Sequence, residues 1–144
     1  MNNRAKNNKI HISAPTKRTT YNKRYGERNI LEGLCYFCKN KKLPNSKYCE
    51  DHFFKVLSRS RLGDRNKYIL LKDLFYSQNK KCYLTGIDLT LGVNASLDHI
   101  RPIASHPELK NDINNVAFCD SCVNIMKGTL SINELKERCK LILK

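Results

Sequence analysis

The sequence contains no apolar run close to the roughly 18 residues of a membrane-spanning helix, and it shows no signal-peptide pattern. These absences predict a protein that neither spans a membrane nor is obviously secreted. Internal repeats are absent too, which excludes a repeat architecture. At 144 residues, the chain is expected to form one domain or two small modules around a modest core.

Acidic residues are scarce: 13 Asp and Glu stand against 27 Lys and Arg, a net charge of +14. Residues 1–67 hold 17 basic and 5 acidic side chains, whereas residues 68–144 hold 10 and 8. We therefore expect the first part to bind the phosphate backbone of nucleic acid and the nearly neutral second part to tolerate a cation-dependent site. Ribosomal and chromatin-type proteins share such charge, so a basic structural protein of a ribonucleoprotein is one alternative.

The cysteines do not form the pattern of a disulfide framework. Cys35 and Cys38 have two residues between them, and ten residues further on come Cys49 and, at Cys-x-x-His spacing, His52. This spacing is typical of structural zinc, and the turn-rich connection suits two ligand pairs that fold back on one ion. Disulfides or free thiols are the alternative, but an odd number of cysteines with a suitably spaced histidine favours zinc. Zinc spacing also fits a reducing, intracellular compartment.

A second group of polar residues lies between positions 97 and 128. Asp98 and Asn124 offer oxygen ligands of the kind that Mg²⁺ prefers, and His99 offers a base near neutral pH. Neighbouring side chains point to opposite faces of a regular strand, so Asp98 and His99 can share a site only if the strand ends or twists there. Pro102 supports such an end. Singly, these residues would be ordinary turn, cap or surface residues; their joint order and spacing favour a catalytic site.

Three short motifs in this region resemble those of HNH endonucleases, whose ββα-metal unit runs strand, loop, strand, helix. Asp98-His99-Ile100-x-Pro102 looks like the first motif, Asn115-Val116 like the second, and Asn124 within Asn-x-Met-Lys-Gly like the third. The resemblance covers less than half of the chain.

This resemblance implies hydrolysis of DNA phosphodiesters with a single divalent ion, Mg²⁺ or another. According to the resemblance, Asp98 and Asn124 are metal ligands and His99 is the general base. Asn115 then holds the loop that positions His99. DNA is then the expected partner, bound through its phosphate backbone. A zinc-dependent nucleic-acid-binding protein with an inactive HNH unit is the second possibility.

HNH proteins similar to this one also carry a further zinc, held by two Cys-x-x-Cys pairs. Cys119 and Cys122 match one pair, whereas Cys82 is followed by Thr85 where the second cysteine is expected. Cys139 could complete the set in space, but its place on the apolar side of a helix favours a small core residue. The sequence leaves two interpretations open, a second zinc site or a degenerate, metal-free version of it.

We therefore expect an α+β protein of three parts: a disordered basic arm over residues 1–30, a zinc-binding module with a basic helix over residues 31–66, and an HNH nuclease domain over residues 67–144. Apolar spacing predicts a helix over residues 68–75, with Ile69, Leu70, Leu71, Leu74 and Phe75 in the core. A capping box from Ser131 to Glu134 predicts a final helix. Its expected apolar face consists of Leu135, Cys139, Ile142 and Leu143.

Overall fold

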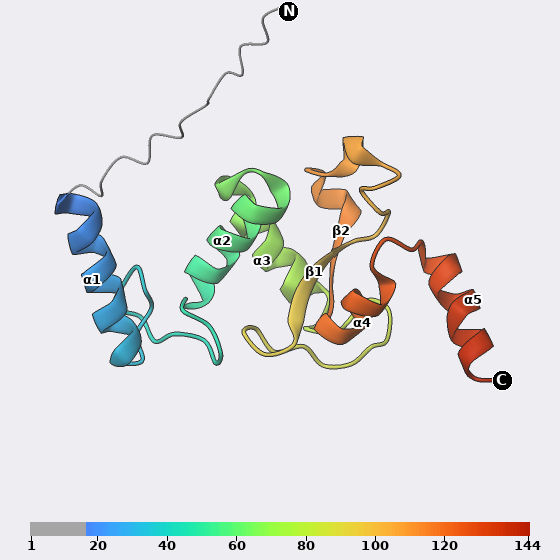
Figure 1. Cartoon of the computed structure of the whole chain (residues 1–144), viewed down its shortest axis with the longest axis horizontal. Helices are drawn as coiled ribbons and strands as arrows, with labels where there is room; N and C mark the ends of the chain where they lie inside the picture. The colour runs from blue at the N-terminus through green and yellow to red at the C-terminus, as the bar shows by residue number, and fades with distance from the viewer. Residues whose placement is uncertain (1–16) are drawn as a thin grey trace, which may run out of the picture.

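The chain adopts a mixed α+β fold in the computed structural model, which describes residues 17–144 (Figure 1). The helices are α1 (Lys17–Leu31), α2 (Glu50–Leu62), α3 (Tyr68–Ser77), α4 (Ser121–Lys127) and α5 (Ile132–Ile142). The strands are β1 (Ala95–His99) and β2 (Val116–Asp120). This element order confirms the prediction of an α+β protein. Among the described residues, no helix is long and apolar enough to cross a membrane.

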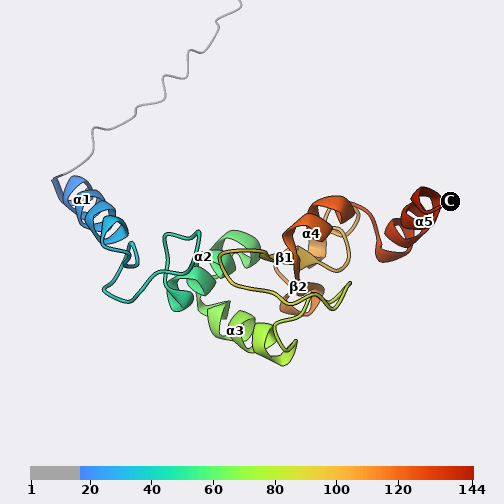
Figure 2. The ribbon, with the colours of Figure 1, turned by 90° about the horizontal axis from the view of Figure 1, so that it is seen from below.

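The strands β1 and β2 pair antiparallel and place different side chains on their two faces. Leu97 lies opposite Phe118, and Asp98 lies opposite Ala117. Directly opposed residues share a face, so Leu97 and Phe118 point one way and Asp98 points the other. Figure 2 shows α3 on one side of the strands and α4 on the other. The sheet therefore separates an apolar side from a side that carries polar residues.

The core forms on the apolar side, where α2 and α3 meet the sheet. The ring of Phe118 lies 6.1 Å from that of Phe54 in α2 and 5.0 Å from that of Phe75 in α3, measured between centroids. Leu62 and Leu71 complete the contact between the two helices and are buried. Residues on both sides of the predicted boundary between residues 66 and 67 therefore pack into one core.

Only one face of α3 is buried. Leu71 and Phe75, one helical turn apart, are almost fully inaccessible, while Leu74 packs partly against the core. The prediction that Ile69 and Leu70 also belong to the core is wrong, since both side chains are about half exposed. Their positions lie on the outer side of a helix that has a packing partner on one side only.

Residues 17–31 form α1, which corrects the expectation that the whole segment 1–30 is a disordered arm. Asn29, fully buried, donates from its side-chain amide to the carbonyl oxygens of Cys35 and Cys38, at 3.0 and 3.2 Å. Gly26 lies directly against the ring of Tyr36, where a Cβ atom would clash. These contacts attach α1 to the cysteine-bearing loop. Residues 1–16 of the predicted arm lie outside the described residues.

The final helix, α5, begins as the sequence predicts. Ser131 accepts a hydrogen bond from the backbone N–H of Glu134, and the Glu134 carboxylate accepts one from the N–H of Ser131. Leu135 and Cys139 are partly covered, but Ile142 and Leu143 are exposed. Only the first turns of α5 therefore have an apolar neighbour.

We expect Asn29→Ala to release α1 from the loop. Two carbonyl groups would lose their partner, at a cost of about 1–3 kcal/mol. Hydrogen exchange should show faster exchange across residues 20–31 and unchanged exchange in β1 and β2. The exposed Asn22→Ala is the matched control. Equal exchange rates in the two variants would show that Asn29 does not hold the helix.

Candidate functional site

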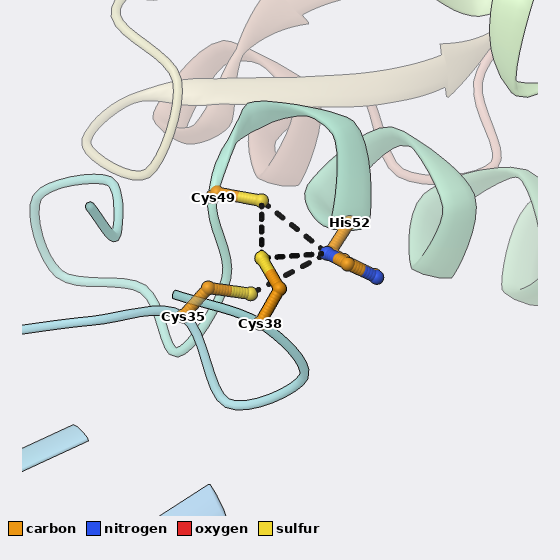
Figure 3. A group of neighbouring side chains, drawn as sticks. All are labelled: Cys35, Cys38, Cys49 and His52. Atoms are coloured by element: carbon orange, nitrogen blue, oxygen red, sulfur yellow. Dashed lines mark hydrogen bonds between the residues drawn. The ribbon is translucent and has the colours of Figure 1, made fainter. Parts of the chain in front are cut away.

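A cluster of four potential metal ligands lies where the loop after α1 meets the start of α2. The sulfur atoms of Cys35, Cys38 and Cys49 and the Nδ1 atom of His52 all lie within 4.8 Å of one another. Figure 3 shows the three sulfur atoms gathered around the near ring nitrogen of His52. The structure therefore brings together all four residues that the sequence assigned to structural zinc.

Four interatomic distances within this cluster fit a tetrahedral ion. Zn–S bonds of about 2.3 Å and Zn–N bonds of about 2.0 Å place two sulfurs about 3.8 Å apart, and a sulfur and a nitrogen about 3.5 Å apart. The Sγ atoms of Cys38 and Cys49 are 3.7 Å apart. Nδ1 of His52 lies 3.5, 3.6 and 3.3 Å from the sulfurs of Cys35, Cys38 and Cys49. The cluster can hold a metal ion, and its geometry is consistent with structural zinc.

The surroundings of Cys35 and His52 favour the protonation states that bind a metal. Burial alone would raise the pKa of Cys35, but hydrogen bonds, led by that from the backbone N–H of Cys49, lower it overall. Burial raises the pKa of Cys49 to about 11. Burial, together with the charges of Lys55 and Arg65, lowers the pKa of His52 and favours its neutral form. Neutral imidazole and thiolate are the forms that bind metal.

We expect Cys38→Ser to abolish zinc binding and to unfold the loop, because a structural site contributes about 10–16 kcal/mol to a small zinc module. Elemental analysis should find one zinc per wild-type chain and none in the variant, and circular dichroism should show a loss of helix. Cys122→Ser, which changes an exposed cysteine outside the cluster, should keep its zinc. Equal zinc in both variants would contradict the assignment.

A second candidate site is a pocket of about 300 Å³ at the end of β1. Its lining residues are Arg61, Leu97, Asp98, His99, Pro102, Ile103, Ala104, Asn124, Ile125, Gly128 and Thr129. The strand ends at His99, as Pro102 led us to expect, and the pocket draws on both neighbouring residues, Asp98 and His99. Asn124 reaches it from α4. The structure thus places an acid, a histidine and an amide around one space.

A backbone carbonyl fixes the orientation of His99. Its Nε2 lies 3.0 Å from the carbonyl oxygen of Lys110, so this nitrogen carries the proton and donates it. The tautomer leaves Nδ1 as the basic atom. Asn115 holds the backbone just after β1. Its side chain accepts from the N–H of Arg101 and donates to the Arg101 carbonyl, at 2.9 and 3.1 Å.

The amide of Asn124 is anchored through its nitrogen. Nδ2 donates to Ser96 Oγ at 3.0 Å and to the carbonyl of Leu97 at 3.3 Å. Both acceptors belong to β1, so the amide group is held against the strand. The remaining atom, Oδ1, is the one that can act as a ligand or acceptor.

Asp98 is held by a buried ion pair. Lys127, only 1% exposed, donates from Nζ to the Asp98 carboxylate at 3.1 Å and to the carbonyl of His99 at 2.8 Å. The hydroxyl of Tyr83 donates to Asp98 Oδ2 at 2.6 Å. Burial and this contact with Asp98 raise the pKa of Tyr83, so the phenol stays protonated.

Lys127 and Tyr83 were not expected at this site, and Arg61 was expected only as one cation of the basic helix. Lys127 follows Asn124 by three residues and therefore shares its helical face, a spacing that could have indicated a common site. Tyr83 and Arg61 come from segments far from residues 97–128 in the sequence. No local pattern indicates that either of them lies at this pocket.

The three cysteines of the possible second zinc site, Cys82, Cys119 and Cys122, are not brought together. The sulfurs of Cys82 and Cys119 lie 3.4 Å apart, both buried. Cys122 is exposed at the start of α4, and Cys139 lines a separate groove beside Leu84. Within residues 20–144, the Cys3His group is the one cluster of three or more metal-ligating side chains. The ligand set of a second zinc site is therefore incomplete in this structure.

Comparison with known proteins adds no functional assignment. No protein-family model, no curated protein and no solved structure matches the chain. The function proposed below is therefore inferred from the geometry of the two sites.

We expect Lys127→Met to destabilise the fold by about 3–5 kcal/mol, because it leaves the Asp98 carboxylate buried without its counter-charge. The exposed pair of Lys140 and Glu137, 2.8 Å apart, provides the control, and Lys140→Met should cost less than about 1 kcal/mol. Urea denaturation measures both. Similar midpoints for the two variants would contradict a structural role for the buried pair.

Proposed function

We propose that this protein is a metal-dependent HNH endonuclease that cuts or nicks DNA, with β1, β2 and α4 as its ββα-metal unit. The observation that carries the proposal is the pocket shared by Asp98, His99 and Asn124. These are the residues expected from the resemblance, and they come from two elements that lie 22 or more residues apart in sequence.

His99 is the general base of the proposed reaction. Nδ1 takes a proton from a water molecule, the water oxygen bonds to phosphorus, and the bond from phosphorus to the leaving sugar oxygen breaks. The Lys110 carbonyl selects the neutral tautomer in which Nε2 carries the proton and Nδ1 can accept one. Asn115 acts through the backbone of Arg101 and is a positioning residue.

Asp98 and Asn124 would hold the divalent ion. An ion there supplies charge to stabilise the phosphate and leaving oxygen. The donor set fits Mg²⁺, because it consists of oxygen atoms and is small enough to leave room for water and substrate. A carboxylate has about four acceptor positions, so Asp98 Oδ1, which accepts from Lys127, retains capacity for an ion.

The proposed substrate is DNA bound through its phosphates. The helix α2 carries Lys55, Arg59 and Arg61, and Arg61 lines the pocket of His99. This cation lies where a phosphate group would need a positive neighbour.

One observation favours the second candidate, a zinc-dependent nucleic-acid-binding protein whose nuclease unit is inactive. The Asp98 carboxylate is already neutralised by Lys127. If an ion does not displace part of this interaction, the pocket lacks a negative ligand. DNA binding without cleavage in the presence of Mg²⁺ distinguishes this candidate from the nuclease.

We expect His99→Ala to lower plasmid nicking in Mg²⁺ by about 10²- to 10⁴-fold, the usual contribution of a general base. DNA binding should change little, because the basic side chains remain. Gel analysis of supercoiled plasmid measures nicking, and fluorescence anisotropy measures binding.

His106→Ala is the matched control for this experiment. His106 lies in the loop between the strands and contacts Ser105, at 3.0 Å between Nδ1 and Oγ, outside the Asp98 pocket. Its variant should nick at the wild-type rate. A His99→Ala protein that keeps near-normal nicking would refute the role of His99.

A further inference from the structure

A separate hollow of about 270 Å³ lies beside the Cys3His cluster. It is lined by Phe37, His52, Lys55, Val56, Arg59 and Arg65. Phe37 comes from the turn between Cys35 and Cys38, and most of the other residues come from α2. The cleavage step proposed above does not use this hollow.

The hollow is strongly basic. Three of its six lining residues are cations, and none is acidic. No carboxylate in the described part of the chain forms an ion pair with Arg59 or Arg65, and both are exposed. Lys55 lies over the ring of Tyr68, 4.8 Å from its centroid. Unpaired guanidinium groups that share one hollow are suited to an oxyanion such as phosphate.

An aromatic ring forms another wall of the hollow. Phe37 is 52% exposed, although it lies next to the Cys3His cluster. Its ring stacks on Tyr48 with 5.6 Å between centroids and an interplanar angle of 6°, and it lies 5.3 Å from the ring of His52. These neighbours fix the plane of Phe37 while half of its surface remains accessible. A ring held this way can stack on a nucleobase at little entropic cost.

We propose that this hollow binds an unpaired nucleotide of a DNA strand. Arg59 and Arg65 bind its phosphate, and Phe37 stacks on its base. A base within a duplex is already stacked on its neighbours, so an accessible ring beside a phosphate site favours a single-stranded segment. The inference rests on the proposed function only in taking DNA as the partner, and it requires no cleavage.

The test compares a labelled single-stranded oligothymidylate with a blunt duplex of the same length, by fluorescence anisotropy, with zinc-loaded protein and no added Mg²⁺. Phe37→Leu should weaken single-strand binding by about 5- to 100-fold, the range expected for the loss of one stacked base. Its duplex affinity should change less than twofold. Phe37→Tyr keeps the ring and should bind the single strand as the wild type does.

Control variants distinguish binding in this hollow from the effects of positive charge and exposed aromatic rings elsewhere on the protein. Arg59→Ala should weaken single-strand binding and reduce the salt slope by about 0.7, as expected for one lost phosphate contact. Arg138→Ala, an exposed arginine of α5, and Tyr76→Leu, an exposed ring of α3, should have little effect. Zinc content, measured for each variant, shows whether the module remains folded.

Cross-linking on the wild-type protein provides a measurement that needs no substitution. A strand containing 5-iododeoxyuridine should form its photochemical cross-link on the peptide that holds Phe37. Cross-links confined to other peptides, or a zinc-containing Phe37→Leu protein that binds the single strand within twofold of wild type, would overturn the inference.

The outcome is distinguishable from that of the nuclease experiment. Single-strand binding through Phe37 without plasmid nicking would keep this inference and refute the nuclease. Plasmid nicking by the wild-type protein, together with normal single-strand binding by the Phe37→Leu variant, would support the nuclease and refute this inference.

Discussion

The buried ion pair between Lys127 and Asp98 fixes how α4 lies on β1. An ammonium group loses several kcal/mol of hydration when it leaves water, so it must find full compensation inside the protein. The Asp98 carboxylate and the His99 carbonyl supply it, and Tyr83 adds a hydrogen bond to the carboxylate. Because these partners must all be in place together, the pair specifies one arrangement of strand and helix. That arrangement also sets the backbone position of His99.

Local patterns were sufficient to predict several features of this structure. The ligands of the Cys3His cluster lie within 18 consecutive residues, so their spacing almost determines that they meet. The capping box at Ser131 is likewise a contact over three residues. The end of β1 at His99 follows from Pro102, which disfavours a continued strand. In each case the cause and its effect lie close together in the chain.

The remaining features depend on contacts between distant residues. Lys127 would be read as a solvated lysine, because its partner Asp98 is 29 positions away. The segment that became α1 has a polar composition typical of disorder, but Asn29 and Gly26 find partners in the next loop. The amino-acid composition of the segment does not show that Asn29 and Gly26 have these partners. The same reason explains α3, where the apolar sequence alone does not show that only one face has a neighbour.

The helix α2 connects the two candidate sites physically. Cys49 and His52 place its start in the Cys3His cluster, Phe54 and Leu62 place its middle and end in the core, and Arg61 reaches the pocket of His99. A helix of 13 residues is a rigid element, so a metal ion bound by Cys49 and His52 would also restrict where Arg61 can lie. The Cys3His cluster therefore lies at the start of a basic helix whose side chains line both the hollow of Phe37 and the pocket of His99.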